Sequence, residues 1–172
     1  MSQLTETAKN QLRQAVIKAI NKAVSEGELP EGEAPEFTIE VPNDRAHGDF
    51  ATNAAMVSAR LFRKSPAVIA KAILDRLDLK STYASSAEIA GAGFINFRLS
   101  DNFYADILID ILNEKENFGR SDFGKGKSVD VEFVSANPTG PMHIGNARGG
   151  ALGDCLASVL EAAGYDVTRE FY

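Results

Sequence analysis

The 172 residues are 44% hydrophobic and 24% charged, with a formal net charge of −6 at pH 7, which is typical of a globular protein of one domain or two small ones and argues against a surface coated in positive charge for nucleic acid. No run of about 18 apolar residues is present to cross a membrane, and the polar N-terminus lacks a secretory signal. Cys155 is the only cysteine, so no intrachain disulfide can form and a reducing cytoplasm is the expected compartment.

The chain begins with a helical pattern and continues with short elements of both kinds. Apolar residues between Leu4 and Val24 recur at helical spacing and predict an amphipathic helix, and an acidic loop rich in Gly and Pro follows. Residues 37–41 alternate between apolar and polar side chains, which predicts a strand. A loop is expected next, and Asp49 is placed to cap a helix over about 51–62.

Two more helices are expected on either side of a pair of strands. Ser65 and the proline after it are typical of a cap and a first helical turn, which predicts a helix over about 66–77. Residues 86–100 predict two strands separated by a Gly-Ala-Gly break, and residues 101–115 predict a helix capped by its first aspartate. Residues 1–115 therefore predict a self-contained α+β domain.

The pattern changes after a segment at 116–128, whose glycines and charges are typical of a linker. Residues 129–134 predict a strand, residues 144–163 predict a long helix that ends before a glycine, and residues 165–172 predict a second strand. This β-α-β order favours a parallel sheet, and with it the start of a Rossmann-like α/β domain over 129–172.

A sheet of only two parallel strands leaves its edges unpaired and needs cover on both faces. We therefore expect the chain to be truncated, as a fragment of a longer polypeptide. The alternative is a small complete domain in which the last β-α-β unit folds onto the first domain.

The loop between the last two predicted elements lies where ligands bind in parallel α/β sheets, beyond the carboxyl end of a strand. The helix that follows offers unpaired N–H donors and a partial positive charge, which attract phosphate. His143 and Asn146 are three residues apart, so they are expected to lie together on the first helical turn and to donate hydrogen bonds to oxygens. Neither the dinucleotide-binding nor the P-loop glycine motif is present. The alternative role for His143 is a structural hydrogen bond.

A second feature is a locally basic segment inside the acidic chain. Between Val41 and Leu77 the cations outnumber the three aspartates; they are Arg45, Arg60, Arg63, Lys64, Lys71 and Arg76. By charge alone, a solvated helix face is the favoured explanation.

Two stretches of the sequence resemble one known family. The segment "ANPTGPMHIGN", with "VEFVS" before it and "ARGGALGDCLASVLEAAGYDVTREFY" after it, resembles the nucleotide-binding signature of arginyl-tRNA synthetases, which are class I aminoacyl-tRNA synthetases. The segments "HGDFATNAAMVSARLFRKSPAVIAKAIL" and "IAGAGFINFRLS" resemble the N-terminal additional domain of the same family. Together these matches cover nearly the whole chain.

The resemblance implies an arginine–tRNA ligase, in which ATP, L-arginine and the arginine tRNA give arginyl-tRNA, AMP and pyrophosphate. It implies that His143 and Asn146 are the catalytic contacts to the ATP phosphates, and that Gly145 leaves room for the adenine. Mg²⁺ is expected to arrive with ATP as substrate, with no protein metal site and no tightly bound cofactor. The implied ATP-binding positions are Pro138, Thr139, Gly140, His143, Gly145 and Asn146.

The arginine substrate is implied to be held by Glu132, Ser135 and Asn137, since a carboxylate suits a cationic ligand. The alternative for Glu132 is an ordinary solvent-facing strand residue. The fourth position of the signature is Asn146, whereas histidine is common in the family; asparagine can donate a hydrogen bond but cannot take a positive charge, which weakens the expected phosphate contact.

The family's N-terminal domain touches the outer corner of the tRNA, which makes the basic segment the candidate RNA surface. The tRNA-binding positions implied are Asn53, Arg60, Arg63 and Lys64. Phe50 is a further candidate for stacking on a base, with a core position as its alternative.

Two other functions remain open from the sequence. One is another nucleotidyl-transferring enzyme with the same signature, and the other is a non-catalytic RNA-binding module. The protein is expected to be a monomer that does not bind membranes, and this chain alone is expected to be inactive.

Overall fold

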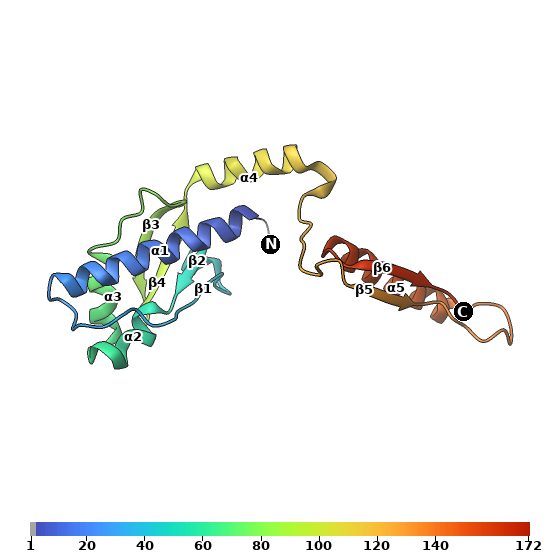
Figure 1. Cartoon of the computed structure of the whole chain (residues 1–172), viewed down its shortest axis with the longest axis horizontal. Helices are drawn as coiled ribbons and strands as arrows, with labels where there is room; N and C mark the ends of the chain where they lie inside the picture. Colours follow the sequence, from blue (N-terminus) through green and yellow to red (C-terminus); the bar gives the residue numbers. More distant parts are fainter. Residues whose placement is uncertain (1–2) are drawn as a thin grey trace. The chain divides into compact units, whose positions relative to one another are not determined.

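The computed structural model describes residues 3–172. Its contacts divide the chain into two compact units, one that ends at Asn113 and one that runs from Glu114 to Tyr172. We call them the N-terminal unit and the C-terminal unit (Figure 1). None of the helices within residues 3–172 combines the length and hydropathy that a membrane span requires. How the units correspond to functional domains stays a prediction.

The N-terminal unit is built on a four-stranded antiparallel sheet. Its strands are β1 (Ile39–Glu40), β2 (Phe50–Thr52), β3 (Ala84–Ala90) and β4 (Phe94–Leu99), in the spatial order β1-β2-β4-β3. The predicted pair of strands around Gly-Ala-Gly is the β3–β4 hairpin, which confirms that prediction. The glycines at its turn have φ values of +53° and +130°, a region that favours glycine over other residues.

Four helices belong to this unit, and Figure 1 shows α1 running along the sheet. The buried side of α1 recurs every three or four residues and packs into the core, as the periodicity predicts. The largest fully buried side chains include Leu12, Ile20, Phe62, Ile69 and Phe97, so the core lies between α1, α2, α3 and β4. The helices are α1 (Gln3–Ser25), α2 (Ala54–Phe62), α3 (Pro66–Leu74) and α4 (Asp101–Glu114), with one 3-10 turn, η1 (Arg45–His47), before β2.

The prediction around Asp49 is wrong. Residues 50–52 form strand β2, which pairs with β4, and helix α2 begins only at Ala54. The Asp49 carboxylate caps no helix; it accepts hydrogen bonds from Leu99 N at 2.8 Å and from the Tyr104 hydroxyl at 3.1 Å. Sheet pairing to a strand some 45 residues later overrode the local helical pattern, which periodicity alone does not reveal.

Two further boundaries differ from the predicted ones, and one alternative is decided. The first strand is shorter than 37–41, and α3 ends at Leu74 instead of about residue 77. Phe50 is only 3% exposed and belongs to the core, so its alternative role is the correct one and it cannot stack on a base.

The C-terminal unit contains the predicted β-α-β crossover. Strand β5 (Ser128–Glu132) and strand β6 (Asp166–Glu170) pair in parallel, and α5 (Ile144–Ala162) connects them. A short 3-10 turn, η2 (Lys115–Asn117), precedes β5. Backbone N–H groups of Ser121, Gly124 and Gly126 donate to the carbonyls of Ala162, Ala163 and Gly164 at 2.8–2.9 Å, so this part of segment 116–128 is bonded to the end of α5.

Candidate functional site

The two residues singled out in the signature lie together at the start of α5. His143 is the N-cap residue, and its Nδ1 accepts a hydrogen bond from Gly145 N at 3.1 Å. The Oδ1 of Asn146 accepts in return from His143 N at 3.0 Å. This reciprocal pair is a capping box, in which each side chain satisfies a backbone donor that the first turn would leave unpaired.

The capping box decides which atoms remain available to a ligand. Because Nδ1 of His143 is an acceptor here, the neutral imidazole holds its proton on Nε2, which is then a free donor. The Oδ1 of Asn146 is occupied, so its NH₂ group provides the remaining donors. The structural role foreseen as the alternative for His143 is therefore fulfilled by one ring nitrogen while the other stays able to bind.

The expectation that backbone N–H groups are unpaired at this helix end holds only in part, because three of them have partners. Gly145 N is bonded to the imidazole, and the N–H groups of Asn146 and Ala147 donate to the His143 carbonyl at 2.9 and 3.3 Å. A Cβ at position 145 would lie 2.8 Å from Cε1 of His143, so the imidazole occupies the space beside this glycine. The donors that remain for a ligand are therefore mainly on the side chains of His143 and Asn146.

The loop before the helix is exposed. Its prolines, Thr139 and Gly140 all face solvent, and a hydrogen bond from Thr139 N to the Asn137 carbonyl at 2.8 Å closes a tight turn. Ser135 is tied to the end of the chain, since its Oγ accepts from Tyr172 N at 3.1 Å. Asn137 itself is exposed.

Glu132 has a neighbour that sequence reasoning missed. It is the last residue of β5 and pairs in register with Glu170, the last residue of β6. In-register residues of adjacent strands lie about 4.8 Å apart with their side chains on one face, so two exposed carboxylates stand side by side at the carboxyl end of this sheet. The available signal was that both glutamates lie two residues before the end of a predicted parallel strand.

The N-terminal unit presents three exposed cations at one helix end. Arg60 lies in the last turn of α2, Arg63 ends that helix in the left-handed conformation with φ of 50°, and Lys64 follows. Within residues 3–172 no ion pair joins these three side chains to a carboxylate. Cations at a helix carboxyl end also complement the helix dipole, which is the ordinary explanation for them.

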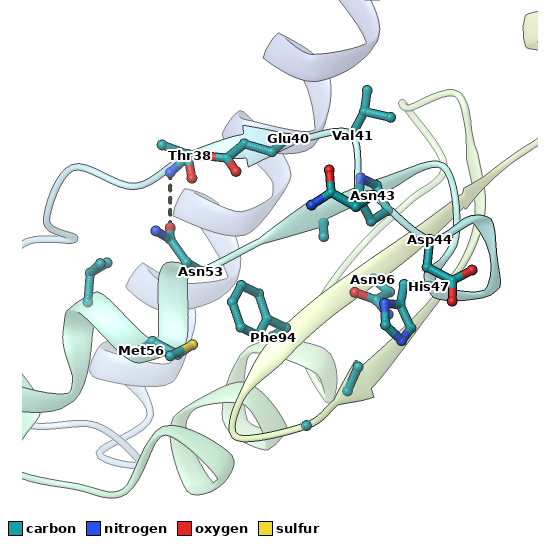
Figure 2. Close-up of a pocket in the computed structure, with 15 residues that line it drawn as sticks. Thr38, Glu40, Val41, Asn43, Asp44, His47, Asn53, Met56, Phe94 and Asn96 are labelled. Carbon is teal, nitrogen blue, oxygen red and sulfur yellow. Dashed lines mark hydrogen bonds between the residues drawn. The ribbon is translucent and has the colours of Figure 1, made fainter.

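Asn53 lies at the edge of a pocket of about 820 Å³ (Figure 2). Its Oδ1 accepts from Thr38 N at 3.0 Å, so it also ties the chain before β1 to the start of α2. Phe94 and Asn96 line the same pocket from β4; the Phe94 ring is 40% exposed, whereas Asn96 is 4% exposed. Figure 2 shows the ring and the two amides around one opening, with Met56 beside them.

Phe94 and Asn96 were not selected from the sequence, although the pattern contained a signal. They alternate with Ile95 and Phe97, which are fully buried, so they share the face of β4 opposite the core. The exposed Phe94 ring is therefore a candidate for ligand contact, whereas Asn96 is largely buried at the wall of the pocket.

Comparison with known proteins identifies the family. Residues 10–99 match the family model described as "Arginyl tRNA synthetase N terminal domain", and residues 107–172 match "tRNA synthetases class I (R), catalytic domain". The chain belongs to the arginyl-tRNA synthetase family. The resemblance seen in the sequence is thereby confirmed, as is the expected fold class: an α+β N-terminal domain followed by the start of a Rossmann-like α/β domain.

Curated relatives of the arginyl-tRNA synthetase family match over the whole chain. The arginine–tRNA ligase of Acetivibrio thermocellus is 55% identical over 172 residues, which are 100% of this chain and 30% of that protein. The arginine–tRNA ligase of Ruminiclostridium cellulolyticum is 52% identical over 171 residues, or 99% of this chain and again 30% of the relative. The chain thus spans about 30% of the length of these relatives.

Solved structures of the family agree with the fold. The Thermus thermophilus arginyl-tRNA synthetase aligns with a TM-score of 0.50 and 31% identity over 92% of this chain and 24% of its own. The Plasmodium falciparum arginyl-tRNA synthetase aligns with a TM-score of 0.59 over 99% of this chain and 31% of its own; at 18% identity it supports the fold alone.

Proposed function

We propose that this chain forms the N-terminal part of an arginine–tRNA ligase, which activates L-arginine with ATP and transfers it to its tRNA. The observation that supports this most directly is the pair of side-chain donors on His143 and Asn146 at the start of α5. In this reaction the arginine carboxylate attacks the α-phosphorus of ATP and pyrophosphate leaves. Positioned donors stabilise the charge that builds on the phosphate oxygens.

The remaining residues divide between the two substrates. Glu132, with Glu170 beside it, supplies negative charge suited to the cationic side chain of arginine, and Ser135 and Asn137 follow on the same chain segment. Mg²⁺ enters with ATP as part of the substrate, and the proposal requires no tightly bound cofactor. The residues proposed to contact ATP are Pro138, Thr139, Gly140, His143, Gly145 and Asn146.

The activity is tested in a chimeric protein in which this chain replaces the matching N-terminal part of the Acetivibrio thermocellus enzyme. We expect ATP–pyrophosphate exchange that depends on arginine. Exchange that depends on a different amino acid would favour another nucleotidyl-transferring enzyme. A chimera that is folded and binds tRNA but exchanges no pyrophosphate would contradict the proposal and favour a non-catalytic RNA-binding module.

We further propose that the N-terminal unit contacts the tRNA. The three cations at the end of α2 are available to phosphates. The pocket at the start of the same helix presents Phe94 and Asn53, a ring and an amide of the kinds that proteins use to stack on and hydrogen-bond an unpaired base. Charge and stacking contribute separately, since the first is screened by salt and the second is not.

The RNA contact is tested on the 172-residue chain by tRNA binding at several salt concentrations. Charge reversal of Arg60, Arg63 and Lys64 should weaken binding and flatten its salt dependence, with a log–log slope reduced by about 2 to 3. Phe94→Ala should weaken binding by about 1–3 kcal/mol without changing the slope. Reversal of Lys18, Lys80 and Lys125, which are exposed elsewhere on the chain, is the matched control. Equal losses in both charge-reversal variants would contradict the proposal.

Oligomeric state and compartment complete the proposal. We place the protein in the cytoplasm, where its one exposed cysteine stays reduced, and we expect a monomer and no aminoacylation by this chain alone. Sedimentation of the 172-residue chain and of the chimera measures the oligomeric state, and a tRNA-charging assay with the chain alone measures aminoacylation.

A further inference from the structure

The chain turns sharply where it leaves β5. Phe133 still donates its N–H to the Glu170 carbonyl at 3.1 Å, and the next residue, Val134, has a φ of +64°. A β-branched residue in the left-handed region is a genuine outlier, and such a conformation persists only where the surroundings determine it. Val134 is the only β-branched residue with positive φ within residues 3–172.

Helix α5 packs against this turn through two residues that have no side chain. A Cβ at Gly153 would lie 2.3 Å from both Cβ and Cγ of Phe133, and a Cβ at Gly150 would lie 2.9 Å from Cγ2 of Val134. Gly149, next to them on the same helix, has nothing within 4 Å. The two glycines that face the turn are therefore in close contact with it, whereas Gly149 is not.

We propose that Gly150 and Gly153 are positioning residues that hold the Val134 turn, and through it set Ser135 and Asn137 relative to Glu132. This inference rests on the proposed function, in which those three residues bind arginine. The turn lies between Glu132 and Ser135, so any shift of the strand exit changes the distance between the two groups. His143 and Asn146 are fixed to each other by hydrogen bonds within their own helical turn, so such a shift leaves their mutual geometry unchanged.

The size of the shift follows from the geometry. Ordinary van der Waals contact begins near 3.4 Å, so Gly153→Ala must move the backbone of Phe133 or the helix by about an ångström. Rotation of the Phe133 ring cannot relieve this contact, because one of the clashing atoms is Cβ itself. The clash of Gly150→Ala is milder and meets a methyl group of Val134, which Val134→Gly would remove while also suiting the positive φ.

The direct test compares amide NMR shifts in the 172-residue chain. Gly153→Ala and Gly150→Ala should move the amide signals of residues 133–137, whereas Gly149→Ala should leave them in place. The double variant Gly150→Ala with Val134→Gly should restore the positions seen with Val134→Gly alone. Unmoved signals in both Gly153→Ala and Gly150→Ala would overturn the inference, and so would equal movement in Gly149→Ala.

The functional test uses the chimeric enzyme. Gly153→Ala and Gly150→Ala should raise KM for arginine, by about tenfold to a hundredfold for the first. They should raise KM for ATP much less, because His143 and Asn146 keep their mutual geometry. A loss of folded protein alone would lower kcat with both KM values unchanged, and that result would also overturn the inference. A parent chimera without arginine-dependent exchange refutes the proposed function instead, and the NMR comparison still decides whether the glycines hold the turn.

Discussion

His143 has two separable functions in the structure, and two substitutions can tell them apart. Its Nδ1 accepts from Gly145 N at 3.1 Å as a helix cap, and its Nε2 is left to donate to a ligand. His143→Ala removes both. His143→Gly also removes every side-chain donor, but glycine is well tolerated as an N-cap residue and costs the helix only about a few tenths of a kcal/mol.

The two losses differ in size. Loss of the cap costs about 1 kcal/mol of stability, a factor of about five in the folding equilibrium, which leaves a stable protein almost fully folded. Loss of one donor to a developing phosphate charge costs about 2.7–4 kcal/mol of transition-state stabilisation, or roughly 10²–10³ in rate. The rate effect therefore cannot come from the cap alone.

The assay is arginine-dependent ATP–pyrophosphate exchange in the chimeric enzyme, with the thermal unfolding midpoint measured on the same samples. We expect both variants to lose about 10²–10³-fold in exchange, and only His143→Ala to lose stability. Exchange at the parent rate in His143→Gly would refute the reasoning, because the histidine would then be a cap and nothing more.

Three further predictions concern other parts of the chain. Asn146→Asp keeps the oxygen that accepts from His143 N and places a negative charge at a helix N-terminus, so its thermal stability should match or exceed that of the parent. It should exchange pyrophosphate more slowly than Asn146→Ala, because the carboxylate repels phosphate and alanine does not; faster exchange than Asn146→Ala would contradict this. Gly48→Ala should cost several kcal/mol of stability in denaturant unfolding, because φ is +89° and the new Cβ would lie 2.6 Å from the Phe97 carbonyl oxygen. Gly27→Ala, with φ of +78° and open space around the new Cβ, should cost only the backbone strain of about 1 kcal/mol. Equal costs would show that the close approach at Gly48 is unimportant. The hydrogen bond from Tyr83 to the Asp106 carboxylate raises the pKa of Tyr83, and burial adds to this shift, so the stabilisation is complete below the tyrosine's ordinary pKa near 10 and is lost as pH rises through the higher folded value. Tyr83→Phe should therefore cost about 1 kcal/mol of stability at pH 8 and flatten the alkaline loss of stability in unfolding measured against pH. An unaltered alkaline profile would count against this prediction.

Elements with a strong local pattern were predictable, and elements that depend on distant pairing were not. The long amphipathic α1, the β3–β4 hairpin and the β-α-β unit follow from periodicity and glycine placement. Strand β2 was missed because its three residues are a strand only through pairing with residues 95–97. For the same reason Asp49 was assigned to a cap, although its carboxylate holds Leu99 N and Tyr104 instead.

The candidate sites show the same division. The closeness of His143 and Asn146 follows from helical spacing, which the order of the residues alone provides. The carboxylate pair Glu132–Glu170 and the pocket around Phe94 both need the register of two strands, which the sequence does not state. Sites formed by residues of one helical turn can therefore be predicted from the sequence, whereas sites formed between strands can be predicted only once the pairing of the strands is known.

The capping box also changes how phosphate recognition at α5 has to work. A bare helix N-terminus binds phosphate through backbone N–H groups, but here the first-turn donors of Gly145, Asn146 and Ala147 already have partners within the helix. A phosphate can gain the Gly145 N–H only if the imidazole of His143 leaves it, at the cost of the cap. The less costly contact is through Nε2 of His143 and the NH₂ group of Asn146, which keeps both capping hydrogen bonds intact. Histidine suits this position because its two nitrogens lie on opposite sides of one rigid ring, so it can hold the helix and the ligand at the same time.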